Sequence, residues 1–281
     1  MPSSEDQPLS IVHVLGSLHV GGGERIALLL GQRQVADGHR VAVVSLEQPP
    51  GGGLFAEFAR AGIGVHTVPK GAGFDATLYP RLYAKFREIR PDVVHTHNPP
   101  PQIYAIGPAK LAGARVVHTK HGPHPDAWHR LWLRRGGAAL ADSFVVISPM
   151  TAEFARQLRE SSDRKMRVVQ NGTDLDRFIP DAAARKATRE RLGVPEDAVL
   201  VGTVGRMAKV KNHALLVRAV APLLGSGLHL AIAGGGAEAA TTAALVEELG
   251  VGANVHLVGE ISAIPEFLAG LGQEGAVIFG V

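Results

Sequence analysis

Short apolar runs alternate with amphipathic stretches along most of this chain. The first run, LSIVHVL at Leu9–Leu15, has the largely apolar character of a strand covered on both faces of a parallel sheet. A glycine-rich loop, a helix-period pattern and a second apolar run at His39–Leu46 follow it. This order predicts a βαβ unit with a right-handed crossover.

The same alternation continues through the first half of the chain. It predicts strands at Val65–Val68, Asp92–His95, Ala114–Thr119, Phe144–Ile147 and Met166–Val169, and helices at Leu54–Ala61, Leu78–Arg90, Gln102–Leu111 and Pro149–Arg159. Strands that alternate with helices predict a doubly wound parallel sheet. Residues 1–178 are therefore predicted to form one self-sufficient α/β domain, followed by a linker at 179–198 that carries Pro180, an Ala/Arg-rich helix and Pro195.

A cationic loop follows the next apolar strand, Val199–Val204. Gly205 opens a turn that places Arg206 and Lys211 beyond the carboxyl end of this strand, before a predicted helix at His213–Leu224. Ligands bind α/β sheets at this edge, and an Arg fork with a mobile Lys beside a helix N-terminus suits a diphosphate. The alternative, two solvated surface cations, stays open at this point.

Three glycines, Gly21–Gly23, occupy the equivalent position after the first strand. Their backbone N–H groups can approach an anion or a sugar closely because no side chains intervene. Their spacing is not G-x-G-x-x-G, and a merely flexible turn is the alternative.

Histidines cluster at predicted strand ends, in HTHN and HTKHGPH. His121 is predicted to be a hydrogen-bond donor or acid–base group that faces a cleft, with a satisfied strand-end histidine as the alternative. His95 and His118 lie inside strand patterns and are predicted to be core residues. No metal site is predicted, because no carboxylate accompanies these histidines at ligand spacing.

Composition narrows the classes of function. The 281 residues are 46% hydrophobic and 20% charged, with no cysteine, a net charge of +3 and a pI of 9.3. There is no Lys/Arg run or aromatic-studded basic ribbon, so nucleic acid is not an expected partner, and the absence of cysteine excludes disulfides and thiolate sites. The amino terminus has no signal-peptide pattern and no apolar run approaches a membrane span, so a cytoplasmic protein is expected.

One stretch, WHRLWLRR, suggests peripheral contact with an anionic membrane. It places Trp128, Leu131, Trp132 and Arg135 along one helical face, with Arg130 and Arg134 around it. Core packing with solvated arginines is the competing interpretation.

The motifs together resemble those of retaining family 4 glycosyltransferases, which have the GT-B fold. The resemblance runs from Ile11 to about Leu268 and rests on six landmarks in order: GGGER, HTKHG, VVISPMTAEF, VVQNGTDLDRF, VGTVGRMAKVKN, and LAIAGGGAEAA followed by VHLVGE. It implies two Rossmann-like domains, an acceptor-side one at 1–178 and a nucleotide-sugar-binding one at 199–281. The expected donor is a UDP- or GDP-linked sugar with no further cofactor and no metal, and the expected acceptor is a glycan, a lipid-linked sugar or a small molecule.

The resemblance also implies roles for particular residues. Arg206 and Lys211 would grip the donor diphosphate, and His121 would lie near the transferred sugar. The backbone at Gly22 and Gly23 would approach the phosphate and the sugar. The glycine-rich turn with Gly234 and Gly236 would belong to the donor site, and the loop with Val258 and Glu260 would lie near the base.

The carboxyl end departs from the family pattern. We count about four strands after residue 198, including one at Ala276–Phe279, where about six are expected, and the donor-side glutamates of the family have no counterpart, since Glu274 lies in a different context. A shortened second domain with incompletely covered sheet faces is therefore expected, as in a truncated or frame-shifted product.

Two alternatives stay open. A non-catalytic nucleotide-binding remnant would bind a nucleoside diphosphate without transferring sugar. An NAD-dependent oxidoreductase is conceivable because GGGAEA matches G-x-G-x-x-A between a strand and a helix, and Glu260 then mimics a ribose-binding acid.

Overall fold

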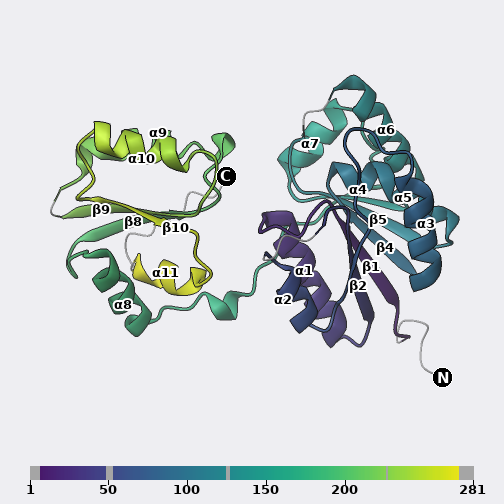
Figure 1. Cartoon of the computed structure of the whole chain (residues 1–281), viewed down its shortest axis with the longest axis horizontal. Helices are drawn as coiled ribbons and strands as arrows, with labels where there is room; N and C mark the ends of the chain where they lie inside the picture. The colour runs from purple at the N-terminus through teal and green to yellow at the C-terminus, as the bar shows by residue number, and fades with distance from the viewer. Residues whose placement is uncertain (1–6, 49–52, 125–126, 226, 272–281) are drawn as a thin grey trace. The chain divides into compact units, whose positions relative to one another are not determined.

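The computed structural model describes residues 7–48, 53–124, 127–225 and 227–271. It separates into two compact units, Met1–Thr173 and Asp174–Val281. Each unit contains a parallel sheet with helices on both faces (Figure 1). The parallel α/β class of both units was predicted from the alternation of patterns.

The first unit contains a seven-stranded parallel sheet in the order β3-β2-β1-β4-β5-β6-β7. Its strands are β1 (Ser10–Leu15), β2 (Arg40–Ser45), β3 (Gly64–Thr67), β4 (Val93–His97), β5 (Arg115–Lys120), β6 (Ser143–Val146) and β7 (Met166–Val168). Its helices are α1 (Gly22–Ala36), α2 (Phe55–Arg60), α3 (Leu78–Ile89), α4 (Pro99–Tyr104), α5 (Ile106–Leu111), α6 (Trp128–Leu140) and α7 (Pro149–Gln157). The strand order reverses between β1 and β4, which makes the carboxyl ends of these two strands the expected place for a ligand.

Two apolar layers sandwich the middle of this sheet. On one face Val12, Val14 and Val94 pack with α3 and α5, and on the other Val41 and Val43 pack with α1 and α2. Because side chains alternate across a strand, His13, His95 and His97 lie on the face opposite Val12, Val14 and Val94. In the register of the sheet, His13 pairs directly with His95.

The second unit contains a three-stranded parallel sheet in the order β10-β9-β8. Its elements are η1 (Leu175–Arg177), α8 (Ala182–Leu192), β8 (Val199–Val204), η2 (Lys209–Lys211), α9 (His213–Val220), η3 (Ala221–Leu223), β9 (Leu228–Ala233), α10 (Ala239–Glu248), β10 (Val255–Gly259) and α11 (Ile264–Gly270). The second α/β sheet is smaller than the first, as expected, and the predicted strand at 276–279 and Glu274 lie outside the described residues.

The expectation of uncovered sheet faces was wrong for the described strands. Helices α8 and α11 cover one face, through Leu200, Phe267 and Leu271, and α9 and α10 cover the other (Figure 1). The central residues of β9, Leu230 to Ala233, are fully buried. The sequence prediction missed α11 and assigned α8 to a linker, so it left this sheet without the two helices that close one of its faces.

Helix α8 belongs to the second unit rather than to a linker. The buried guanidinium of Arg189 donates hydrogen bonds to the carbonyl oxygens of Gly270, Pro195 and Ala198. The hydroxyl of Thr188 donates to the carbonyl of Glu266. These bonds fasten α8 to α11 and to the entrance of β8, and they place residues 182–192 within the folded unit.

Smaller differences concern element ends. The predicted helix at Gln102–Leu111 is two helices, α4 and α5, which meet at Ala105. The predicted strand at Asp92–His95 extends to His97, so the second histidine of HTHN lies in the sheet.

Candidate functional site

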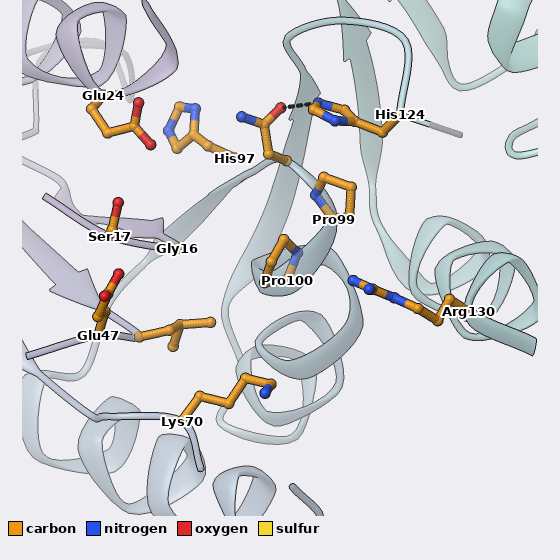
Figure 2. Close-up of a pocket in the computed structure, with 12 residues that line it drawn as sticks. Gly16, Ser17, Glu24, Glu47, Lys70, His97, Pro99, Pro100, His124 and Arg130 are labelled. Carbon is orange, nitrogen blue, oxygen red and sulfur yellow. Dashed lines mark hydrogen bonds between the residues drawn. The ribbon is translucent and has the colours of Figure 1, made fainter. Parts of the chain in front are cut away.

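A pocket of about 700 Å³ lies at the carboxyl ends of the strands in the first unit (Figure 2). Its walls come from the segments that follow β1, β2, β3, β4 and β5, together with α1 and α6. The lining residues are Gly16, Ser17, Glu24, Leu46, Glu47, Lys70, His97, Asn98, Pro99, Pro100, His124 and Arg130. Hydroxyl, amide, carboxylate and cationic groups thus surround one cavity at the point where the strand order reverses.

Asn98 is the structural centre of this pocket. Its backbone has φ 63° and ψ 175°, a conformation that costs a non-glycine residue about 1–3 kcal/mol. Its Oδ1 accepts hydrogen bonds from the backbone N–H of His121 at 3.1 Å and from Nε2 of His124 at 3.0 Å. The strained residue therefore holds the loop after β5 against the end of β4.

The structure brings two of the predicted site residues, Gly23 and His121, together. A Cβ atom on Gly23 would lie 3.3 Å from Cδ2 of His121 and 3.2 Å from Nδ2 of Asn98. A side chain at position 23 would displace one of them. Gly22, by contrast, is exposed and has open space around it. Gly21 is the N-cap of α1 and, as a glycine, provides no side-chain cap.

A row of hydrogen-bonded histidines lies beneath His121. Nε2 of His121 is 2.9 Å from Nδ1 of His97, and Nε2 of His97 is 3.0 Å from Nδ1 of His13. Nε2 of His13 lies 2.8 Å from Oε1 of Gln34 on α1. His95 stands beside this row and lies 2.7 Å from the Thr119 hydroxyl through its Nε2.

Burial keeps these imidazoles neutral. It lowers the pKa of His13, and burial together with neighbouring histidines lowers the pKa values of His95 and His97 well below the ordinary value. Burial lowers the pKa of His121 to about 4 and that of His118 to about 3. At neutral pH each ring therefore has one N–H donor and one acceptor nitrogen.

The geometry also offers a metal-type cluster. His13, His95 and His97 bring ring nitrogens within 4.8 Å of one another, and they are the one such group among the described residues. Both nitrogens of His13 and His97, however, already take part in hydrogen bonds to Gln34, to each other and to His121. The residues therefore fit a hydrogen-bonded network without an ion, and the absence of a metal requirement stays a prediction.

A buried charge cluster supports the loop that carries His121 and His124. Glu160 accepts hydrogen bonds from Lys120 at 3.0 Å and from Arg134 at 2.6 Å and 2.9 Å, and all three side chains are almost completely buried. Nη1 of Arg134 also donates to the carbonyl of His124 at 2.8 Å. Burial raises the pKa of Glu160, but the two cations outweigh it and hold that pKa below its usual range.

The competing interpretation of α6, core packing with solvated arginines, was wrong for its two tryptophans and for Arg134, whereas Arg130 is exposed as that interpretation expected. Arg134 is buried, whereas Trp128 is 74% exposed and Trp132 is 62% exposed. The guanidinium of Arg135 lies 5.0 Å from the centre of the Trp132 ring. None of the described helices has the length and apolar character needed to cross a bilayer.

In the second unit, Arg206 and Lys211 lie on the loop between β8 and α9. Both are exposed, and neither has an ion-pair partner among the described residues. Met207 between them is buried in the core, and Asn212 caps α9 by accepting a hydrogen bond from the N–H of Leu215. The loop is therefore anchored at its middle and at its end while its two cations face solvent.

Gly234 and Gly236 fasten this loop to the turn after β9. Both glycines have positive φ. A Cβ atom at position 234 would collide with the carbonyl oxygen of Gly205, and a Cβ atom at position 236 would lie 2.5 Å from the carbonyl oxygen of Met207. The N–H of Met207 in turn donates to the carbonyl of Gly235 at 2.7 Å. The space that a dinucleotide would need beside these glycines is filled by protein backbone, which argues against the dinucleotide interpretation.

The remaining two predicted donor-side residues lie at the end of β10. Val258 is partly buried against the core, and Glu260 is exposed with its side chain over Gly235, where a Cβ atom would lie 2.8 Å from it. The carboxyl ends of β8, β9 and β10 thus present Arg206, Lys211 and Glu260 at one edge of the sheet. The nine predicted site residues lie at the carboxyl-end side of the sheet of their own unit, with Gly22 and Gly23 in the first turn of α1 and Val258 within β10.

Comparison with known proteins decides the family. The family model described as Glycosyltransferase Family 4 matches residues 20–177, more than half of the chain. This chain belongs to that family. A second model, Glycosyl transferases group 1, matches residues 184–272. The family assignment favours the glycosyltransferase interpretation over the oxidoreductase alternative.

Individual relatives agree with this assignment. A D-inositol 3-phosphate glycosyltransferase of Stackebrandtia nassauensis is 29% identical over 76% of this chain and 55% of its own length. A GDP-mannose-dependent alpha-(1-6)-phosphatidylinositol monomannoside mannosyltransferase of Mycolicibacterium smegmatis is 35% identical over 56% of this chain and 43% of its own. The chain thus spans about half the length of these relatives.

Solved structures show the same fold. The crystal structure of HepE from Anabaena, in complex with UDP and glucose, superposes with a TM-score of 0.81 at 17% identity, over 93% of this chain and 72% of HepE. A glycosyltransferase from Rickettsia africae gives a TM-score of 0.79 at 18% identity, over 96% and 72%. Both support a GT-B architecture with a smaller second domain.

Sequence reasoning missed three residues of the first unit's site. Asn98 follows His95-Thr96-His97 in the sequence, and nothing in the sequence apart from its polarity indicates a role in the site. Its strained backbone conformation is visible only in the folded structure. His97 and Gln34 are far apart in sequence and meet only because β1 pairs with β4 beneath α1. The alternation of histidines with apolar residues in β1 and β4 was the one available hint that these histidines share a face.

Proposed function

We propose that this protein transfers a sugar from a nucleotide-sugar donor to a hydroxyl-bearing acceptor, with retention and without a metal ion. The observation that carries the proposal is that both family models match, one on each unit. The residues that the family resemblance singles out lie on the carboxyl-end side of the sheet in both units, where α/β sheets bind ligands. The HepE structures with UDP and with UDP-glucose support a nucleotide sugar as the donor.

Arg206 and Lys211 are proposed to bind the donor diphosphate. Sugar transfer builds negative charge on the departing nucleoside diphosphate, so fixed cations at that place stabilise the transition state more than the ground state. Both side chains are exposed and have no ion-pair partner among the described residues, which leaves them available for an anion. The N-terminus of α9 adds partial positive charge beside them.

Val258 and Glu260 are proposed to lie near the nucleotide base, and Gly234 and Gly236 to hold the cationic loop in place. The close approach of the two loops at these glycines supports the second role.

His121 and the backbone at Gly22 and Gly23 are proposed to contact the transferred sugar and its phosphate. The support is the contact between Gly23 and His121 and the uncapped first turn of α1. A neutral imidazole suits a sugar hydroxyl, because it can donate one hydrogen bond to the hydroxyl or accept one from it without carrying a charge.

The pocket is proposed to hold the acceptor. Ser17, Asn98 and Glu47 are groups that hydrogen-bond hydroxyls, while Lys70 and Arg130 provide positive charge at the same cavity (Figure 2). A polyol or sugar that carries an anionic group fits both features. The names of the relatives, which act on an inositol phosphate and on a phosphatidylinositol mannoside, support this acceptor class.

A lipid-linked acceptor is proposed as one form of this class. Arg130 lines the pocket and stands on α6 between Trp128 and Trp132, whose rings are exposed. Aromatic side chains of this kind bind at membrane interfaces. Flotation with anionic vesicles should be reduced in the double variant Trp128→Ala/Trp132→Ala, which removes no buried contact. Equal flotation of parent and variant would remove the membrane contact from the proposal.

The proposed function is tested by acceptor-dependent release of UDP or GDP from a panel of nucleotide sugars. We expect release with one donor, dependent on an anionic polyol acceptor and lost in Arg206→Ala. Binding of a nucleoside diphosphate without transfer to any acceptor would instead support the non-catalytic remnant.

A further inference from the structure

The row of histidines in the first unit ends at the side chain of Gln34 on α1. Four side chains from three elements form it: Gln34 of α1, His13 of β1, His97 of β4, and His121 in the loop after β5. The three distances along the row are 2.8, 3.0 and 2.9 Å, all within hydrogen-bonding range. The rings of His13 and His97 are inclined by 21°, and those of His97 and His121 by 24°. Such small angles allow each N–H to point along the lone pair of the next ring.

The direction of these hydrogen bonds is the same along the whole row. A neutral imidazole has one donor and one acceptor nitrogen, and each inner ring uses both of its nitrogens within the row. Once one end is fixed, every later ring is fixed too. Gln34 presents its carbonyl oxygen, Oε1, to His13, so Nε2 of His13 must be the donor.

The consequence reaches His121 by three steps. Nδ1 of His13 accepts from Nε2–H of His97, and Nδ1 of His97 accepts from Nε2–H of His121. The proton of His121 is thereby on Nε2, and Nδ1 carries a lone pair. That Nδ1 atom is buried and has no hydrogen-bond partner.

We propose that Gln34 acts through His13 and His97 as a positioning residue that fixes the tautomer of His121, so that the free Nδ1 of His121 is an acceptor for a hydroxyl of the ligand. The ligand part of this inference rests on the proposed function, since it assumes that the sugar binds at His121. The buried acceptor without a partner is the feature that a bound hydroxyl would satisfy. A ligand that offers a second acceptor in place of that hydroxyl is disfavoured, because two lone pairs would then face each other.

Four substitutions separate this inference from a merely structural role. Gln34→Glu keeps an acceptor at the end of the row and should leave His121 protonated on Nε2. Gln34→Met keeps the shape but removes the acceptor, so His121 should become a mixture of both tautomers. Gln34→Lys offers only donors and should reverse the row, which moves the proton of His121 to Nδ1. Gln32→Lys, on the exposed surface of the same helix, is the matched control and should change nothing.

The measurement is the tautomeric state of His121 by long-range proton–nitrogen correlation NMR on the ligand-free, full-length protein, with the signal assigned by its loss in His121→Asn. Gln34 is only half-buried, so its variants should fold, and Gln34→Glu against Gln34→Lys suffices if Gln34→Met does not. An Nδ1-protonated His121 in the parent protein overturns the inference. So does an unchanged tautomer in Gln34→Lys.

A second measurement tests the ligand part. Addition of the nucleotide sugar should shift the Nδ1 signal of His121 as it accepts a hydrogen bond, and a donor with that hydroxyl replaced by fluorine should bind about five- to tenfold more weakly, the loss expected for one neutral hydrogen bond. A bound donor that leaves Nδ1 unchanged overturns the ligand part. If calorimetry detects no nucleotide-sugar binding, the proposed function is wrong. The tautomer of His121 is measured in the ligand-free protein, so it tests the role of Gln34 independently of that outcome.

Discussion

The carboxyl-end sites of the two units differ in the charge and the burial of their side chains. In the first unit the site rests on neutral, buried imidazoles that hydrogen-bond to Gln34 and Thr119, and on Asn98, whose Oδ1 accepts from the backbone N–H of His121. In the second unit it rests on exposed cations, Arg206 and Lys211, carried by a loop that backbone contacts at Gly234 and Gly236 fasten. We propose that the first arrangement discriminates hydroxyl groups by direction and that the second attracts anions by charge. The difference predicts that acid damages the first site and that salt weakens the second.

Acidification should produce the largest difference between the units. His118 and His121 have pKa values of about 3 and about 4 in the folded protein, against an ordinary value of 6.5. The folded state favours the neutral forms of both histidines. Their contribution to the free energy of unfolding is therefore complete above pH 6.5 and is lost as the pH falls toward 3–4. At pH 5 each such histidine costs about 2 kcal/mol.

Hydrogen exchange at pH 7 and pH 5, corrected for the intrinsic exchange rate, measures this effect. We expect β1, β4 and β5 to lose more protection than β8 and β9. An equal loss in both sheets would show that the histidines of the first unit do not set a difference between the units, since burial also lowers the pKa of His229 on β9.

The substitution Glu160→Gln should destabilise the first unit by about 3–5 kcal/mol, because Lys120 and Arg134 would then be buried without their counter-charge. Glu153→Gln is the control, since Glu153 is largely exposed and its pair with Arg156 is 3.7 Å long. Denaturant unfolding of the three proteins measures the change. A Glu160→Gln variant as stable as the Glu153→Gln variant would contradict the assigned role of the cluster.

The variants Arg206→Ala and Lys211→Ala should each weaken binding of a nucleoside diphosphate by about 1.5–3 kcal/mol, the range for a charge-assisted contact. Arg218→Ala, an exposed cation on α9, should leave the affinity unchanged. Calorimetric titration with UDP and GDP at two salt concentrations measures both affinity and its salt dependence. Unchanged affinity in both variants would show that Arg206 and Lys211 are solvated surface cations that do not bind the diphosphate.

The variant Gly234→Ala should cost about 1–3 kcal/mol of stability in the second unit, because position 234 has positive φ and its Cβ would collide with the carbonyl of Gly205. It should also displace Arg206 and so weaken diphosphate binding. Gly252→Ala, at an exposed position with open space, is the control. Thermal unfolding and the same calorimetric titration are measured for both variants. Unchanged diphosphate affinity in Gly234→Ala would show that the turn at position 234 does not position Arg206.

The sequence was most informative where periodicity reports burial directly. Apolar runs such as VLVGTV and glycine or proline punctuation predicted the strands of both sheets and placed Arg206, Lys211 and His121 at carboxyl-end loops. It was least informative where a polar residue is buried. Arg134 and Arg189 resemble surface arginines until Glu160 and Gly270, which are distant in sequence, supply hydrogen-bond partners.

The same limit explains α8 and the histidine row. An Ala/Arg-rich segment between two prolines has the composition of a linker, and only the partners of Arg189 and Thr188 reveal that it is part of the second unit. Individual histidines at strand ends gave a correct location for His121. Their connection to Gln34 depends on strand order and register, which no local pattern contains.

The central claim is that the nucleoside diphosphate binds to the second unit while the first unit provides the sugar and acceptor side. Hydrogen exchange with and without UDP or GDP tests it most directly, because it reports each loop separately. The account predicts new protection at residues 205–213 and 234–238, reduced in Arg206→Ala, with little change at the pocket around Asn98. Protection by the nucleotide confined to the loops around Asn98 and His121 would contradict it.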